Sequence, residues 1–177
     1  ANIAGSTSDI LLEPAQLLTL LNRVVLDIGQ RQLVMSFFAT VLDCTTMELS
    51  FSNAGHNQPY LSRQKIEAQD MAQGIHRDLT VLKATGPRLG DIESSKFVQE
   101  RLQLKSGDVL LWFTDGLIEC ENVSKEAFGE KRLENILRNC VGLNALQIKE
   151  KIIASAYQFF GNVPIKDDIA FIVAKIK

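Results

Sequence analysis

The chain has 177 residues, of which 46% are hydrophobic and 23% charged, and a formal net charge of −2, a composition that fits one ordinary globular domain. Lys and Arg form no sustained run, which argues against a nucleic-acid surface because such surfaces need clustered cations to neutralise phosphates. No apolar run reaches the roughly 18–20 residues of a membrane helix, so we expect no membrane insertion.

The three cysteines are widely spaced and form neither a CxxC pair nor a zinc-binding pattern. This usage favours a reducing, cytoplasmic location, with each cysteine packed as a small apolar side chain. The chain opens without Met, and we therefore expect it to be a piece of a longer protein.

The first element expected is a helix from Pro14 to about Asp27, because proline suits the first helical position and Gly29 ends the pattern. Its buried face is predicted from apolar residues at helical spacing: Leu17, Leu18, Leu21, Val24 and Val25. Residues 33–42 and 48–53 then predict an antiparallel hairpin.

Further along, a strand is expected at 58–62, and residues 63–78 read as a polar insertion in which His76 is solvated. Short strands are predicted at 79–83, 98–104 and 109–113, helices at 130–140 and 145–160, and a last strand at 168–175. Strands in the middle and helices towards the ends indicate an α+β layered fold.

The helix at 145–160 carries two further signals. Asn144 and Gln147 resemble a capping box. A stripe of apolar residues predicts the side that faces the core: Ile148, Ile152, Ala156 and Phe159.

Two acidic sites lie at the boundaries of segments that otherwise belong in a core. Asp115-Gly116 follows the apolar run 109–113, and Asp167-Asp168 opens the last predicted strand. A buried ionised carboxylate needs a partner or a metal, so the two sites suggest one shared cation-binding edge. The alternative is that each is only a turn or a solvated loop, although 117–119 does not alternate like the second strand of a tight hairpin.

Six motifs occur in order along the chain, and together they resemble a known family. They are Ser52-Asn53-Ala54-Gly55-His56-Asn57, Gly86-Pro87-Arg88-Leu89-Gly90, residues 104–111, Phe113-Thr114-Asp115-Gly116-Leu117-Ile118-Glu119, residues 128–133, and Asp167-Asp168-Ile169. The chain resembles the SpoIIE-like branch of the metal-dependent PPM (type 2C) serine/threonine phosphatases, which regulate bacterial sigma-factor partner switching.

The resemblance implies an antiparallel β-sandwich flanked by helices, with two Mn²⁺ or Mg²⁺ ions at one edge. It assigns Asp115 and Asp167 as metal ligands. Asp168 stands where many relatives carry Asn, so its place as a third ligand is left open. Hard divalent cations prefer such oxygen ligands, and a pair of them activates water for in-line attack on phosphorus.

The family's other metal-binding aspartates lie upstream of the first helix, and residues 1–13 match neither of their motifs. The resemblance therefore implies that the N-terminal part of the fold is missing and that 1–177 is a single phosphatase domain, the C-terminal fragment of a longer protein. We expect this chain alone to be inactive and the parent protein to be active.

Three other residues are considered for the site. His56 is a candidate substrate contact or general acid, or else a histidine that packs in a loop between strands. Arg88 is a candidate phosphate contact in a glycine-bounded loop. Glu119 is expected to support the Asp115 loop rather than to bind metal, and no residue is assigned a direct catalytic role.

The expected function is a metal-dependent phosphoserine/phosphothreonine phosphatase acting on a phosphorylated regulator such as an anti-sigma-factor antagonist, with a sensor or receiver domain upstream. The alternative is a phosphatase-like module that has lost its chemistry and serves in binding or regulation. Asp115 and Asp167 favour the enzyme, whereas the missing upstream aspartates favour the module or a truncated chain.

Overall fold

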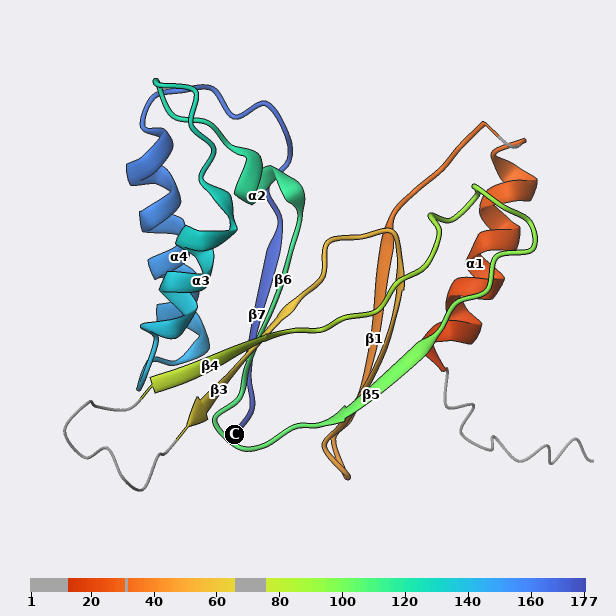
Figure 1. The fold of residues 1–177 in the computed structure, drawn as a ribbon, viewed down its shortest axis with the longest axis horizontal. Helices are drawn as coiled ribbons and strands as arrows, with labels where there is room; N and C mark the ends of the chain where they lie inside the picture. The colour runs from red at the N-terminus through yellow and green to blue at the C-terminus, as the bar shows by residue number, and fades with distance from the viewer. Residues whose placement is uncertain (1–12, 31, 66–75) are drawn as a thin grey trace, which may run out of the picture. The chain divides into compact units, whose positions relative to one another are not determined.

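The structure, a computed structural model, describes residues 13–30, 32–65 and 76–177. Its described residues divide into two compact units, which are considered separately (Figure 1). The first comprises the described residues up to His56 together with Ala84–Gln103, and the second those from Asn57 to Lys83 together with Leu104–Lys177. None of the helices described is both long and apolar enough to cross a membrane.

The first unit is a three-stranded antiparallel sheet with one helix, α1, packed on β1 and β2. Strands β1 and β2 form the expected hairpin, in which Phe37 pairs with Ala54 and Asp43 with Glu48. The elements are α1 (Pro14–Ile28), β1 (Phe37–Asp43), β2 (Glu48–Ala54) and β5 (Gln99–Gln103), and the sheet order is β1-β2-β5.

Helix α1 begins at Pro14 and is followed by Gly29, as predicted. Its buried face contains Leu18 and Val25, with Asn22 between them on the same side. The prediction that Val24 is buried is wrong, because its side chain is 41% exposed. The buried position goes instead to Asn22, whose amide donates to the carbonyl of Ile92 at 3.0 Å and accepts from the Gly90 N–H at 2.8 Å.

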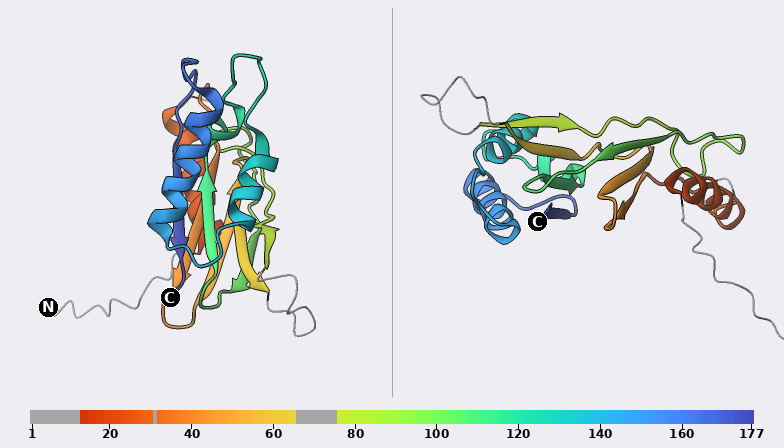
Figure 2. Two further views of the ribbon diagram at one scale, coloured as in Figure 1. Left: turned by 90° about the vertical axis from the view of Figure 1, so that its left-hand side faces the viewer. Right: turned by 90° about the horizontal axis from the view of Figure 1, so that it is seen from below.

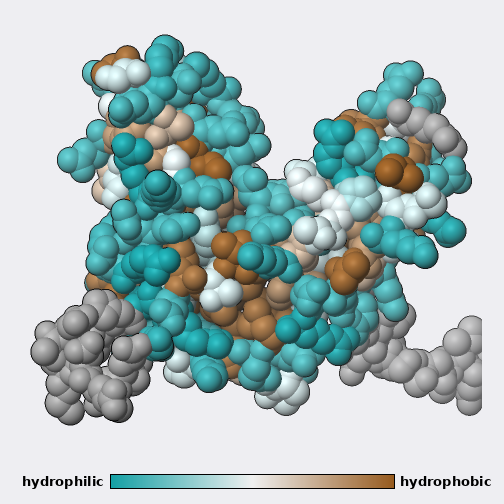
Figure 3. All heavy atoms as spheres, in the orientation of Figure 1, coloured by the Kyte–Doolittle hydropathy of each residue, from teal (hydrophilic) through white to brown (hydrophobic). Residues whose placement is uncertain are grey.

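Helix α1 also carries exposed apolar side chains, those of Leu20, Val24 and Ile28. In Figure 3, brown atoms lie among teal ones in the part of the molecule that holds α1 and the loop beside it.

The second unit is a four-stranded antiparallel sheet of order β4-β3-β6-β7. Helices α3 and α4 lie against it, α3 beside β4 and α4 beside β7 (Figure 2). Its elements are β3 (Tyr60–Lys65), β4 (His76–Val81), β6 (Val109–Phe113), α2 (Asp115–Glu119), α3 (Gly129–Arg138), α4 (Ala145–Phe160) and β7 (Phe171–Lys175).

The core of the second unit follows from the two-residue period of β6. Val109, Leu111 and Phe113 alternate along the strand and are buried in one cluster with residues of α3 and α4. In the ladder with β7, Phe113 pairs with Phe171, so Trp112 and Phe171 lie on neighbouring strands, as predicted. Helices with two antiparallel sheets confirm the expected α+β class.

In helix α4 the predicted capping box is confirmed, and one of the four predicted core residues is wrong. The Asn144 side chain accepts from the Gln147 N–H and the Gln147 side chain accepts from the Asn144 N–H, both at 2.9 Å. The fourth core residue is Phe160 rather than the predicted Phe159, which is only partly buried. The buried face comprises Ile148, Ile152, Ala156 and Phe160.

Four predicted strands have wrong boundaries. Strand β3 spans Tyr60–Lys65 rather than 58–62, so residues 63–65 belong to a strand and not to the expected insertion. Strand β1 begins at Phe37 rather than at residue 33, because the preceding stretch makes only an isolated bridge between Met35 and Leu89. Strand β4 spans His76–Val81 rather than 79–83, which puts the backbone of His76 in a strand, and β7 begins at Phe171 rather than at 168. The rest of the expected insertion, 66–75, lies outside the described residues.

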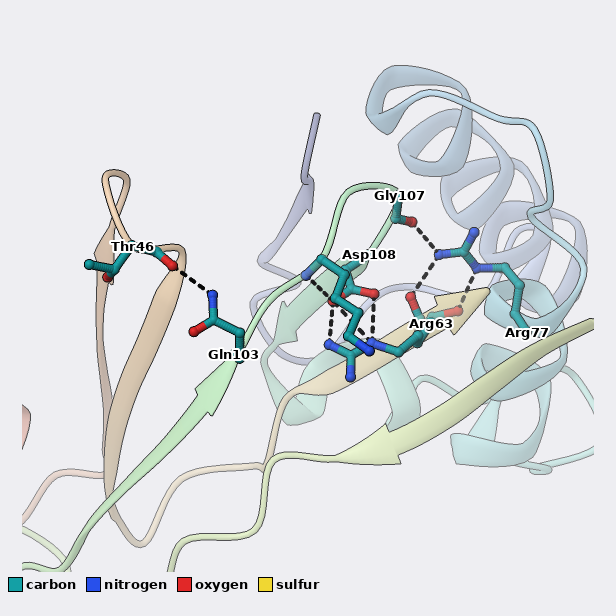
Figure 4. Close-up of polar contacts among 8 residues, drawn as sticks. Thr46, Arg63, Arg77, Gln103, Gly107 and Asp108 are labelled. Carbon is teal, nitrogen blue, oxygen red and sulfur yellow. Dashed lines mark hydrogen bonds and ion pairs between the residues drawn. The ribbon is translucent and has the colours of Figure 1, made fainter. Parts of the chain in front are cut away.

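The turn that leads into β6 is held by two arginines (Figure 4). The carboxylate of Asp108 is buried, and it accepts two hydrogen bonds from Nε of Arg63 and one from Nη2 at 2.6 Å. Arg77, also buried, donates to the hydroxyl and carbonyl of Ser62 and to the carbonyl of Gly107. This buried carboxylate is therefore paired within the fold, and its role is structural.

Candidate functional site

The two acidic sites meet at one end of the second unit's sheet because of how β6 and β7 pair. The strands are antiparallel with Phe113 opposite Phe171, so the residues after β6 adjoin the residues before β7. Asp115 comes two residues after β6, and Asp167-Asp168 precede β7 by a few residues. The sheet topology thus brings together two segments that are about fifty residues apart in the chain.

Thr114 links these two segments directly. Its backbone N–H donates to the carbonyl of Ala170 at 2.9 Å, which extends the β6–β7 ladder by one bond. Its hydroxyl oxygen accepts from the Ala170 N–H at 3.0 Å and lies 3.0 Å from the carbonyl oxygen of Asp168, to which it donates. The hydroxyl also lies 3.3 Å from the carbonyl oxygen of Ala170, which shares the hydroxyl proton with the Asp168 carbonyl. Four contacts therefore join the residue before Asp115 to the acidic loop.

Gly116 allows the segments to approach closely. A Cβ atom on this glycine would lie 2.5 Å from the carbonyl oxygen of Asp168 and 3.4 Å from that of Asp167. Asp115 opens helix α2, so the Asp-Gly pair is not the turn of a hairpin. Asp167 and Asp168 lie in an exposed loop before β7, as the solvated-loop reading expected, and the backbone of this loop lies against Gly116. The shared cation-binding edge stays a prediction.

The three carboxylates at this edge are exposed. One oxygen of Asp115 accepts from the Gly116 N–H at 3.1 Å, and one oxygen of Asp167 accepts from the Asp168 N–H at 2.8 Å. Such carboxylate oxygens suit a hard divalent cation. Within 13–30, 32–65 and 76–177, however, no group of three or more Asp, Glu, His or Cys side chains is placed to hold one.

A small cavity of about 250 Å³ adjoins this edge, and its lining includes Gly116, Glu119, Lys166 and Asp167. Lys166, directly before Asp167, forms an ion pair of 2.8 Å with Glu121. The hydrogen bond from Lys166 holds the pKa of the Glu121 carboxyl below its ordinary value of 4.5. This ion pair joins the segment just after α2 to the acidic loop. It involves a residue that follows Asp115 in the sequence, whereas the Thr114 contacts involve the residue that precedes it.

The two other predicted site residues, His56 and Arg88, belong to the first unit. A Cβ on Gly55 would lie 2.6 Å from Cγ of Arg88, so the loops that carry His56 and Arg88 are neighbours. The side chain of Asn53 shapes the first loop by accepting from the His56 N–H and donating to its carbonyl. The guanidinium of Arg88 forms a partly exposed ion pair with Asp91, at 3.2 Å.

Thr114 and Lys166 are residues of this edge that were not among the predicted site residues. For Thr114 the sequence does offer one signal, which is a hydroxyl-bearing residue between a buried strand and an acidic residue. Its partners lie 54 and 56 positions away, so no local pattern could identify them.

The whole chain matches a known protein family. The model of the family described as Stage II sporulation protein E (SpoIIE) matches residues 2–177. Among curated proteins, Protein IcfG of Synechocystis sp. (strain ATCC 27184 / PCC 6803 / Kazusa) is 32% identical over 110 residues, which are 62% of this chain and 16% of IcfG.

Solved structures show the same fold. The SiaA-PP2C domain of Pseudomonas aeruginosa is similar with a TM-score of 0.76 and 18% identity, covering 93% of this chain and 61% of that one. The phosphatase domain of the cell fate determinant SpoIIE from Bacillus subtilis, presoaked with Mn, has a TM-score of 0.55 and 15% identity, covering 80% and 56%. The chain thus spans less than two thirds of each of these relatives.

Proposed function

Because the chain belongs to the SpoIIE family, whose solved relatives have the PP2C phosphatase fold, we propose that it carries part of the active site of a metal-dependent phosphoserine/phosphothreonine phosphatase. The observation that supports this most directly is the set of Thr114 bonds that holds Asp115 beside the Asp167-Asp168 loop. We assign Asp115 and Asp167 as ligands of Mn²⁺ or Mg²⁺, with Asp168 as a third candidate.

A bound divalent cation supplies Lewis-acid stabilisation of the phosphoryl oxygens and activates a water as the nucleophile. The chain's own residues have a simpler task, which is to present carboxylate oxygens at one end of a rigid sheet. The exposure of these carboxylates supports a phosphorylated side chain on another protein as the substrate, because a deep pocket would exclude it.

The substrate that we propose is a small phosphorylated regulator of the anti-sigma-factor-antagonist type, and an upstream sensor or receiver domain would control the reaction. Both follow from the family resemblance. The whole protein's activity is part of the same proposal, because the aligned segment is only 16% of IcfG.

Arg88 and His56 remain candidates for contact with the substrate. For Arg88 to bind a phosphate, its guanidinium would exchange the carboxylate of Asp91 for the phosphoryl oxygens, a charge-assisted interaction of the same kind. Replacing Arg88 with Ala should then raise KM more than it lowers kcat.

The proposal is tested by Mn²⁺-dependent hydrolysis of a phosphoserine peptide. The 177-residue chain should show little or no turnover, whereas an N-terminally extended chain from the same gene should be active. Asp115→Asn in the extended chain should abolish turnover, and Asp78→Asn, at an exposed position on β4, should not.

A phosphatase-like binding module is the second candidate. It is favoured by the lack of any cluster of three or more metal-ligating side chains among the described residues. An extended chain that is folded but inactive with Mn²⁺ and Mg²⁺ would support the module and refute the enzyme.

A further inference from the structure

We infer that Thr114 is a positioning residue whose hydroxyl sets the spacing between Asp115 and the Asp167-Asp168 loop, and so tunes the cation affinity of this edge. The inference rests on the proposed function, since it concerns the same carboxylates. Its basis is that one hydroxyl bonds two peptide groups of the acidic loop, at the Asp168 carbonyl and the Ala170 N–H, both at 3.0 Å.

A hydroxyl has one proton to donate and lone pairs with which to accept. That of Thr114 accepts from the Ala170 N–H, and its proton is shared between the Asp168 carbonyl, at 3.0 Å, and the more distant Ala170 carbonyl, at 3.3 Å. The two bonded peptide groups lie on either side of Ile169, so the loop is held at two points rather than one. Asp115 directly follows Thr114, and Asp168 supplies one of the bonded carbonyls. Loss of the hydroxyl's bonds would therefore let the backbone of Asp168 move relative to that of Asp115.

The link joins two segments that each carry candidate metal ligands. Asp115 follows Thr114 directly, and Asp167 and Asp168 lie in the loop that the Thr114 hydroxyl contacts. The backbone bond from Thr114 to Ala170 is the last of the ladder, and the hydroxyl adds two bonds beyond it. Groups that orient metal ligands in this way typically affect metal affinity by about 10- to 100-fold.

Three variants separate the hydroxyl from the packing of the side chain. Thr114→Val keeps the shape and removes the hydroxyl, which leaves the Ala170 N–H and the Asp168 carbonyl without this partner. Thr114→Ser keeps the hydroxyl and removes the methyl group. Thr80→Val makes the same change at an exposed position on β4 of the same unit, and is the matched control.

The measurement is a titration of the isotope-labelled 177-residue chain with Mn²⁺ alone, followed by NMR. Bound Mn²⁺ should broaden the amide signals of Gly116 and Asp168 in the wild-type chain. Thr114→Val should need about tenfold more Mn²⁺ for the same broadening, whereas Thr114→Ser and Thr80→Val should stay within about twofold. Without metal, hydrogen exchange of the Ala170 amide should be faster in Thr114→Val alone.

Two results would overturn the inference, and they differ. Equal broadening in the wild-type and Thr114→Val chains, or an unchanged exchange rate at Ala170, would refute the role of the hydroxyl and leave the proposed metal edge intact. A wild-type chain whose signals near Asp115 and Asp167 do not respond to Mn²⁺ would refute the metal edge, and the inference with it.

Discussion

Gly116 and Asp168 approach each other so closely that a methyl group on the glycine would lie 2.5 Å from the aspartate's carbonyl oxygen and 3.0 Å from its carbonyl carbon. Both obstructing atoms are backbone atoms, which cannot rotate away as the end of a side chain can. The start of α2 and the acidic loop are therefore spaced for a residue without a side chain.

Gly116→Ala should destabilise the fold, although alanine is normally favoured over glycine in a helix by about 1 kcal/mol. Overpacking of this kind costs about 1–3 kcal/mol, so we expect a net loss of up to about 2 kcal/mol in the free energy of unfolding, measured by urea denaturation. Glu119→Ala, exposed on the same helix, should change it by less than about 0.5 kcal/mol. A Gly116→Ala chain more stable than wild type would show that the close approach is absent in solution.

Asp108→Asn should be strongly destabilising because it leaves Arg63 facing a neutral amide in a nearly buried site. Arg63 is 34% exposed and Asp108 only 1%, so we expect a loss of about 2–3 kcal/mol, between the values for a hydrogen bond to a charged group and for a fully buried ion pair. The control is Asp78→Asn, which breaks an exposed pair with Lys65 at 4.0 Å and should cost less than about 0.5 kcal/mol. Similar losses in the two variants would contradict the structural role of Asp108.

Lys166→Met should raise the pKa of Glu121 towards its ordinary value of 4.5, because the hydrogen bond from Lys166 is the main cause of its depression. A carboxyl whose folded pKa is lowered stabilises the fold above its unfolded pKa, and this contribution disappears as the pH falls through the folded value. The variant should therefore lose less stability than wild type as the pH falls below about 4.5.

The pKa itself can be followed by NMR of the Glu121 carboxyl carbon. Lys125→Met is the control, since Lys125 lies 3.6 Å from the same carboxylate and is a minor cause of the shift. The shift on Lys166→Met should shrink at high salt, as exposed ion pairs are screened. An equal shift in both variants would rule out Lys166 as the main partner.

Asp115→Asn and Asp167→Asn should leave the metal-free chain as stable as wild type, within about 0.5 kcal/mol, because both side chains are exposed. Mn²⁺ should raise the melting temperature of the wild-type chain by mass action and should not raise that of either variant. Thermal unfolding with and without Mn²⁺ makes the comparison, with Asp43→Asn as a variant that should respond like wild type. A Mn²⁺ response that survives both substitutions would place the ion elsewhere.

The elements that the sequence predicted well are those with local causes. Asn144 and Gln147 start α4 through bonds between residues three apart, and Val109–Phe113 forms β6 as expected because a short apolar run suits a strand covered by helices. The order of six motifs was likewise enough to indicate the family.

The errors arise where a position depends on the neighbours that pack against it. Phe159 and Phe160 are adjacent in the sequence, and helical spacing alone did not decide which of them would be the more deeply buried in the core cluster. Asn22 takes a buried place on α1 because the backbone around Gly90, 68 residues away, supplies the partner that a buried amide needs.

The sequence by itself determined the class of fold, the family and the identity of the candidate ligands Asp115, Asp167 and Asp168. Periodicity, caps and motifs can each be read from short segments, and the order of the motifs can be read along the chain without knowing how it folds. Only the tertiary structure decided that Asp108 is a paired structural carboxylate and that the hydroxyl of Thr114 reaches the loop of Asp168 across 54 residues. Such contacts depend on the register of β6 against β7, and that register is set by the packing of the whole sheet against its helices.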